Sequence, residues 1–170
     1  MKKIAILGWA VDTQDIEPWL RKQGYEIDIL DEKGKPFGDL SKYDLVVRSP
    51  GVNINRPEFS GLNMTSKTKI FFDVCPATII GVTGTKGKGT TSTLIYEILK
   101  TAGKKVFLGG NIGKGVFADL DKMTKESFVV LELSSFQLID LHKSQHIAVV
   151  LMKTSDHLDW HADVDEYVNA

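Results

Sequence analysis

The chain has 170 residues, of which 42% are hydrophobic and 25% are charged, a composition typical of globular rather than disordered proteins. Its 21 basic and 22 acidic side chains give a net charge of −1, so no strong positive field is available to recruit nucleic acid or an anionic membrane. No apolar run approaches the ~18 residues of a membrane span, and the single cysteine, Cys75, cannot form an internal disulfide, which together predict a cytoplasmic protein without membrane insertion.

The front of the chain alternates short apolar runs with a helical segment, the pattern of a parallel α/β sheet. Strands are expected at residues 3–7, 25–30 and 44–48, with a weaker one at 70–72. A helix capped by Asp12 or Thr13 is expected to run to about residue 23 and to end at Gly24.

Two short turns follow these strands. Gly8 opens the first in the position of a dinucleotide-binding glycine turn, with Asp31 at the end of the second strand. Only the first glycine of that fingerprint is present, so NAD is not expected to bind. The turn Ser49-Pro50-Gly51 ends the third strand.

Residues 73–77 form the predicted boundary between two domains, 1–76 and 77–170, because a second strand–loop–helix unit begins directly after them. Its strand, loop and helix are expected at residues 78–83, 84–89 and 90–102. The apolar face of that helix is expected to consist of Leu94, Ile95, Ile98 and Leu99. Further strands are expected at 105–108, 128–133 and 147–152, the last two apolar enough to be covered on both faces, and a final helix at 164–170.

The strongest chemical signal is the glycine-rich loop between the 78–83 strand and the following helix. Its residues are Gly84, Thr85, Lys86, Gly87, Lys88, Gly89, Thr90 and Thr91. Backbone N–H groups in such a loop converge on phosphate oxygens, the helix N-terminus adds its positive end, and Lys88 supplies a mobile charge. The alternative is a turn that only tightens the strand-to-helix connection. Its place between a clear strand and a clear helix favours nucleotide binding.

Polar residues follow the later strands. Glu132 ends the 128–133 strand, where open α/β sheets bind ligands and a carboxylate can hold Mg²⁺, although a solvated glutamate is the alternative. His157 and His161 are spaced to share a metal on a helix, but the glutamate of a zinc protease motif is absent. Asn111 lies in a glycine-rich loop that a simple turn would also explain.

These motifs, taken in order, resemble those of the Mur ligase and folylpolyglutamate synthetase superfamily. Residues 84–90 look like its ATP loop, and 156–161 (Asp-His-Leu-Asp-Trp-His) look like its histidine element. Residues 132–138 (Glu-Leu-Ser-Ser-Phe-Gln-Leu) are similar to the signature of the Mur ligases that add D-glutamate. The resemblance runs from residue 4 to residue 167. It implies an α/β fold with a Rossmann-like N-terminal domain, followed by a truncated P-loop parallel-sheet domain.

The resemblance also implies ATP and Mg²⁺ as cofactors. It implies two substrates, UDP-N-acetylmuramoyl-L-alanine and D-glutamate, joined through an acyl phosphate. The implied catalytic residues are Lys88, Glu132 and His157. The implied magnesium ligands are Glu132, His157 and Thr90, with Thr91 as a second candidate hydroxyl. The implied substrate-binding residues are Asp31, Ser49, Pro50, Gly51 and Asn111. Asp12 departs from the family pattern, and His161 receives no role.

Members of this superfamily have three domains and more than twice this length. The chain is therefore expected to lack the rest of the central sheet and the C-terminal domain, and not to be a competent ligase alone. The complete enzyme is expected to be a monomer. Three alternatives remain open: a non-catalytic ATP- or UDP-sugar-binding module, an oxidoreductase with a degenerate dinucleotide fold, and a folate-adding ligase, which residues 134–137 disfavour.

Overall fold

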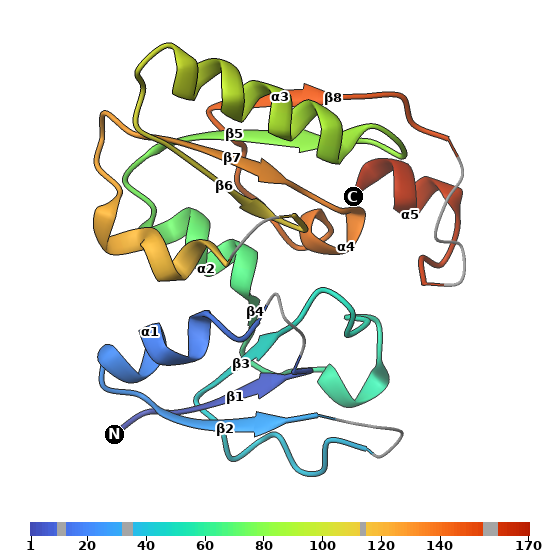
Figure 1. Ribbon diagram of the computed structural model, residues 1–170. Coiled ribbons are helices and arrows are strands. Elements are labelled where there is room, and N and C mark those ends of the chain that lie inside the picture. The colour runs from blue at the N-terminus through green and yellow to red at the C-terminus, as the bar shows by residue number, and fades with distance from the viewer. Residues whose placement is uncertain (10–12, 32–35, 113–114, 155–159) are drawn as a thin grey trace.

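A computed structural model describes residues 1–170 except 10–12, 32–35, 113–114 and 155–159 (Figure 1). The described residues contain two four-stranded sheets, with strand orders β2-β1-β3-β4 and β6-β7-β5-β8. All pairings within both sheets are parallel. The predicted α/β class with two parallel sheets is therefore confirmed. No helix among the described residues is long and apolar enough to cross a membrane.

The first sheet is formed by the front of the chain. Its strands are β1 (Lys3–Leu7), β2 (Glu26–Leu30), β3 (Leu45–Arg48) and β4 (Met64–Ser66). Helix α1 (Ile16–Lys22) connects β1 to β2, and the 3₁₀ helix η1 (Pro57–Phe59) precedes β4. The helix begins after Asp15 rather than after Asp12 or Thr13. The Thr13 hydroxyl instead donates a hydrogen bond to the Gly8 carbonyl.

The second sheet is formed by the rest of the chain. Its strands are β5 (Thr78–Thr83), β6 (Val106–Gly110), β7 (Phe128–Glu132) and β8 (Ile147–Val150). Its helices are α3 (Lys88–Thr101), the 3₁₀ helix η2 (Val116–Lys122), α4 (Ser135–Leu138) and α5 (Val164–Asn169). The strands at 3–7 and 78–83 coincide with their predictions, and β2, β3, β6, β7 and β8 each differ from theirs by one or two residues at one or both ends.

The weak strand predicted at 70–72 is wrong, because these residues lie inside helix α2 (Lys67–Val74). The Ser66 side chain caps this helix by accepting a hydrogen bond from the Lys69 N–H. The Phe71 and Phe72 rings then enter the core on one side of the helix. Two adjacent aromatic residues favour a strand locally, but the serine cap and the core contacts decide for the helix.

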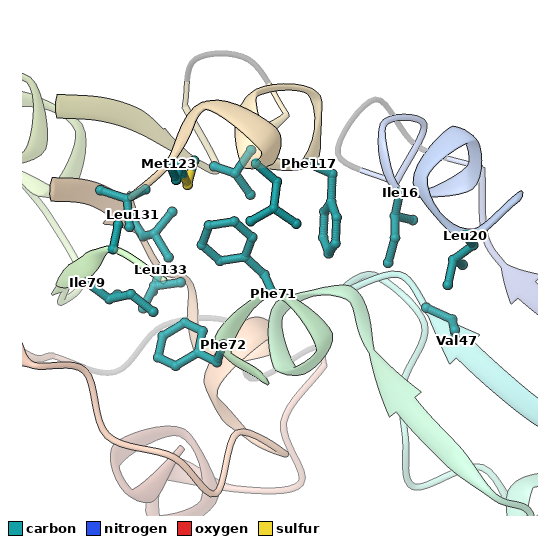
Figure 2. Packing of buried hydrophobic residues seen from close by; sticks show 14 of the residues in the cluster. Ile16, Leu20, Val47, Phe71, Phe72, Ile79, Phe117, Met123, Leu131 and Leu133 are labelled. Atoms are coloured by element: carbon teal, nitrogen blue, oxygen red, sulfur yellow. The ribbon is translucent and has the colours of Figure 1, made fainter. Parts of the chain in front are cut away.

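One hydrophobic core is shared by both sheets, with α2 lying between them (Figure 1). Figure 2 shows Phe71 at its centre, with Val47 of β3 on one side and Ile79 and Leu131 of the second sheet on the other. The Phe71 ring packs edge-on against Phe117 of η2, with centroids 5.6 Å apart. Burial of these apolar surfaces is the main force that holds the two sheets together.

The predicted burial of two elements is partly wrong. On α3, Ile95 and Leu99 pack against the second sheet, whereas Leu94 and Ile98 are 59% and 58% exposed. Strand β8 lies at the edge of its sheet, with Ile147 and Val150 exposed. The apolar run of β8 is therefore not covered on both faces. The prediction failed because a sequence pattern does not reveal whether a strand lies at the edge of its sheet.

Candidate functional site

The carboxyl ends of the strands in both sheets point toward the same side of the molecule, where α4 and α5 lie (Figure 1). This common edge gathers the loops that follow β1, β3, β5, β6 and β7. In open parallel sheets the ligand site lies at this edge, because the connecting loops converge there. The candidate site is therefore built from loops at one side of two sheets.

The glycine-rich loop connects β5 to the 14-residue helix α3. Gly87 is the residue before the helix and has a φ of 85°. The Lys88 ammonium donates to the Gly84 carbonyl at 2.8 Å and to the Thr85 carbonyl at 3.3 Å. The lysine thus folds back over its own loop, where its charge and the helix N-terminus can act on the same phosphate group.

Glu132 lies at the end of β7, directly beside this loop. Only 7% of the residue is exposed, and its Oε2 atom is buried without a hydrogen-bond partner among the described residues. Burial raises the pKa of the Glu132 carboxyl, and the charge of Lys88 opposes that rise. A carboxylate oxygen left without a donor is suited to a cation, which would compensate its desolvation.

Gly89 keeps the space in front of this carboxylate open. A Cβ atom at position 89 would lie 3.4 Å from Glu132 Oε2 and 3.7 Å from a methyl carbon of Ile112. A side chain at position 89 would therefore lie between the first turn of α3 and the Glu132 carboxylate. The general P-loop pattern has serine or threonine directly after its lysine, and Gly89 in this position leaves the space between loop and acid free.

The loop after β6 approaches β7 closely. Gly110 has a φ of 90°, and a Cβ there would lie 2.1 Å from the Glu132 carbonyl oxygen. The next residue, Asn111, donates its backbone N–H to the same carbonyl at 3.0 Å. Asn111 therefore follows β6, the strand next to β7, and its exposed side chain lies one strand away from Glu132.

The front sheet contributes two turns at the same edge. The Gly8 turn packs directly on Ser49, since a Cβ at Gly8 would lie 2.4 Å from Ser49 Oγ. Ser49 and Pro50 are buried, whereas Gly51 is exposed. Asp31 follows β2 and is exposed. The predicted substrate residues of this sheet therefore lie at the ends of β2 and β3, the strands on either side of β1.

Arg48 connects the Ser49-Pro50-Gly51 turn to the second sheet. Its guanidinium contacts both carboxylate oxygens of Asp140 at 2.9 Å and donates to the Phe136 carbonyl at 2.9 Å. The residue is 1% exposed, so this charge is fully withdrawn from water and compensated by a bidentate pair. Sequence reasoning missed Arg48; an arginine ending a buried apolar strand is the signal that could have found it.

Residues 160–167 close over the site from the C-terminal side. Trp160 Nε1 donates to the Gly51 carbonyl at 3.3 Å, and the Tyr167 hydroxyl lies 2.7 Å from Thr85 Oγ1. One segment thus contacts both the front turn and the glycine-rich loop. A cavity of about 120 Å³ lies between the glycine-rich loop and α5, and its lining includes Lys88, Ser135 and Tyr167.

The predicted site residues fall into three groups. The structure brings Gly84, Lys88, Gly89 and Glu132 together. Thr90, Lys86, Asp31 and Asn111 are exposed at the same edge, without a side-chain contact to that group. His157 lies outside the described residues, so its predicted metal role stays a prediction. Among the described residues no three histidine, cysteine or acidic side chains gather into a metal site, so a cation at Glu132 would depend on other ligands.

The site residues fit Mg²⁺ with a nucleotide. Mg²⁺ is commonly held by one or two carboxylates while phosphate oxygens and water complete its shell. Glu132 Oε2 supplies one such oxygen, and the adjoining loop supplies N–H groups and Lys88 for phosphates.

Comparisons with known proteins agree with this geometry. The family profile of the Mur ligase middle domain matches residues 82–170. A UDP-N-acetylmuramoylalanine–D-glutamate ligase of Clostridium botulinum (strain Hall) is 37% identical over 98% of this chain and 42% of its own length. The same-named ligase of Clostridium kluyveri is 35% identical over 99% of this chain and 43% of its own length. The chain thus spans about two fifths of these relatives.

A solved structure supports the fold. The UDP-N-acetylmuramate:L-alanyl-gamma-D-glutamyl-meso-diaminopimelate ligase from Neisseria meningitides superposes with a TM-score of 0.61. The match covers 99% of this chain and 66% of that chain at 18% identity. At this identity the likeness concerns the arrangement of the two sheets and their helices.

Proposed function

The chain belongs to the Mur ligase family, and from that membership we propose that it forms the ATP- and sugar-nucleotide-binding part of a ligase that adds D-glutamate to UDP-N-acetylmuramoyl-L-alanine. One observation carries the proposal. The glycine-rich loop with Lys88 lies beside the buried, unpartnered oxygen of Glu132, in a chain 37% identical to a ligase of that name.

Each part of the site has a proposed task. The loop N–H groups and Lys88 hold the phosphates and neutralise the charge that develops during phosphoryl transfer. Glu132, Thr90 and His157 are the proposed protein ligands of magnesium, which would supply positive charge next to the phosphates. The exposed Asn111 and the front turn after β3 hold the sugar nucleotide, so that its carboxylate faces the phosphate.

The two sheets correspond to a proposed division of labour at residue 76. Residues 1–76 carry Asp31 and the Ser49-Pro50-Gly51 turn, which we assign to the UDP-sugar. Residues 77–170 carry the phosphate loop, Glu132 and Asn111. The contacts of Arg48 and Trp160 hold the two sets of loops in one geometry, which is what an in-line transfer between two bound substrates requires.

Calorimetric titration of the chain tests this proposal. Mg-ATP and UDP-N-acetylmuramoyl-L-alanine are titrated separately into the wild type, Lys88→Ala and Lys100→Ala. We expect both ligands to bind the wild type, and Lys88→Ala to lose Mg-ATP while it keeps the sugar nucleotide. Lys100 is exposed near the far end of the same helix, so its substitution should change neither affinity. Absence of binding to the folded wild type would contradict the proposal.

A second candidate is a module that binds ATP or a UDP-sugar without catalysis. Phosphate release from ATP separates the two. A ligase requires release that depends on D-glutamate, whereas a binding module gives none.

A further inference from the structure

A serine, a histidine and a glutamate beside the phosphate cavity form one hydrogen-bonded chain. His161 Nε2 lies 2.8 Å from Ser135 Oγ, and His161 Nδ1 lies 3.2 Å from Glu166 Oε2. The histidine is 3% exposed, and the ligase proposal gives it no task. These three residues come from different elements, α4, the segment before α5 and α5 itself, so the fold rather than local sequence brings them together.

The direction of each hydrogen bond follows from Glu166. The Ala162 N–H and the Asn55 amide, together with His161, hold the pKa of the Glu166 carboxyl below its usual value, so the carboxylate only accepts. His161 Nδ1 therefore carries the hydrogen, and in the neutral ring Nε2 is left as an acceptor. Ser135 Oγ–H then donates to Nε2. A base placed in this way can remove the serine proton as the oxygen attacks.

The imidazole is fixed in position on several sides. The Phe136 ring stacks on it at an interplanar angle of 19°, and the rings of Trp160 and Tyr167 both meet it edge-on at 70°. Glu166 is fixed in turn by the Ala162 N–H at 2.8 Å. Because the His161 imidazole is held in one rotamer, it loses little conformational entropy when it acts as a base. A mobile surface histidine would lose more.

The serine is accessible while its base is not. Ser135 is half-buried and lines the same 120 Å³ cavity as Lys88. Lys88 therefore lines the space in which an electrophile bound at Ser135 would develop negative charge. The nucleophile and a cation line one cavity, and the base and its orienting acid are hydrogen-bonded in turn behind the serine.

We propose that Ser135, His161 and Glu166 form a reactive serine unit that attacks activated carboxylic acid derivatives, namely esters or acyl phosphates. Ser135 Oγ forms a bond to the acyl carbon while His161 Nε2 takes its proton and Glu166 stabilises the imidazolium. The bond to the leaving oxygen breaks, and that oxygen receives the proton from His161. Water then attacks the acyl-serine by the same route, releasing the carboxylic acid and restoring the serine.

A fluorophosphonate probe tests the serine directly on the chain as it exists. Its phosphorus accepts Ser135 Oγ, and fluoride leaves. We expect mass spectrometry to place the label on Ser135, with Ser135→Ala reduced to background and Ser60→Ala, at an exposed serine, labelled like the wild type. His161→Gln and Glu166→Gln should each slow labelling, the former by about 100-fold, the usual contribution of a general base.

Circular dichroism verifies that each variant is folded, and Glu166→Gln supplies the test of the relay if His161→Gln unfolds. Release of p-nitrophenolate from p-nitrophenyl acetate provides the second measurement, and we expect it to depend on Ser135 to the same degree. Labelling spread equally over exposed serines, or unchanged in a folded Glu166→Gln and His161→Gln, overturns the proposal. The reagents require neither ATP nor a sugar nucleotide, so the result is separate from that of the ligase proposal.

Discussion

The most unusual single residue of the site is Glu132. A buried carboxylate normally accepts hydrogen bonds from nearby donors, but one oxygen of Glu132 has none among the described residues. Without a bound cation this oxygen costs the folded state free energy, since its hydration is lost and not replaced. The Glu132 carboxylate thus destabilises the folded state at a position where it could bind a cation.

Glu132→Gln tests this cost. Without metal or nucleotide at neutral pH, we expect the free energy of unfolding to rise by on the order of 1 kcal/mol, because a neutral amide is cheaper to bury. Since burial raises the folded-state pKa, the penalty is full above that pKa and vanishes below the ordinary glutamate value of 4.5. The gain over wild type should therefore disappear as pH falls through this window.

Urea unfolding at several pH values measures the effect. Glu97→Gln, at an exposed glutamate on α3 paired with Lys100, should change stability by less than about 0.5 kcal/mol at all of them. A Glu132→Gln protein less stable than wild type at neutral pH would show that the carboxylate has a donor in the folded state.

Sequence placed Glu132 at the end of its strand, as observed, because strand ends have local signatures. It placed Lys88 in the loop before the helix, whereas α3 begins at Lys88 itself. It could not reveal the orphaned oxygen, which depends on what covers the strand end. Arg48 was missed, and His161 received no role, for the same reason. Their partners, Asp140 and Glu166, lie on elements whose packing no local pattern predicts.

At the scale of elements, the junction of β6 and β7 determines the shape of the site. Gly110 ends β6 with its backbone against the Glu132 carbonyl, and the following Asn111 N–H completes the contact. Any side chain at position 110 would push the two strand ends apart. The spacing between the Asn111 loop and Glu132 therefore depends on one glycine.

Gly110→Ala should lower the free energy of unfolding by about 3 kcal/mol or more, because a left-handed φ and a direct backbone clash act together. Gly103→Ala is the matched control, since Gly103 has a φ of 72° but nothing within 4 Å of an added Cβ. It should cost only about 1–2 kcal/mol. Thermal and urea unfolding of the two variants give the comparison, and equal losses would show that the clash at Gly110 is relieved by a shift of β7.

Elements with a strong period or a clear cap could be predicted from the sequence, as β5 and α3 show. The exposed Leu94 and Ile98 on α3 could not, since an amphipathic pattern identifies an apolar face but not how much of it is covered. The helix at 67–74 was missed, since two adjacent phenylalanines favour a strand locally.

At the scale of the whole molecule, a shared core and the buried Arg48–Asp140 ion pair join the two sheets. Phe71 contributes to the core from α2, between the sheets. The Arg48–Asp140 pair crosses from β3 to the segment after α4. A buried ion pair of this kind contributes little more to the free energy of unfolding than apolar packing would. Removing one partner, however, leaves an uncompensated buried charge.

Arg48→Met should therefore lower the free energy of unfolding by about 3–5 kcal/mol, and Asp140→Asn should also destabilise. The double variant should lose less than the sum of the two, since neither charge is then left alone. Urea unfolding followed by tryptophan fluorescence measures these values. Arg21→Met, at an exposed ion pair with Glu17, should cost at most about 1 kcal/mol, and an equal loss for Arg48→Met would contradict a structural role for the buried pair.

The shared core also limits how this protein can be recombined with its relatives. A crossover at residue 76 leaves Ile4, Ile6, Val47 and Phe71 with one parent and Ile79, Phe117, Val129 and Leu131 with the other, although these side chains pack in a single cluster. A hybrid gene would thus join two half-cores that were never selected to fit each other. Exchange of the front sheet between family members would succeed only where the residues facing α2 are exchanged with it.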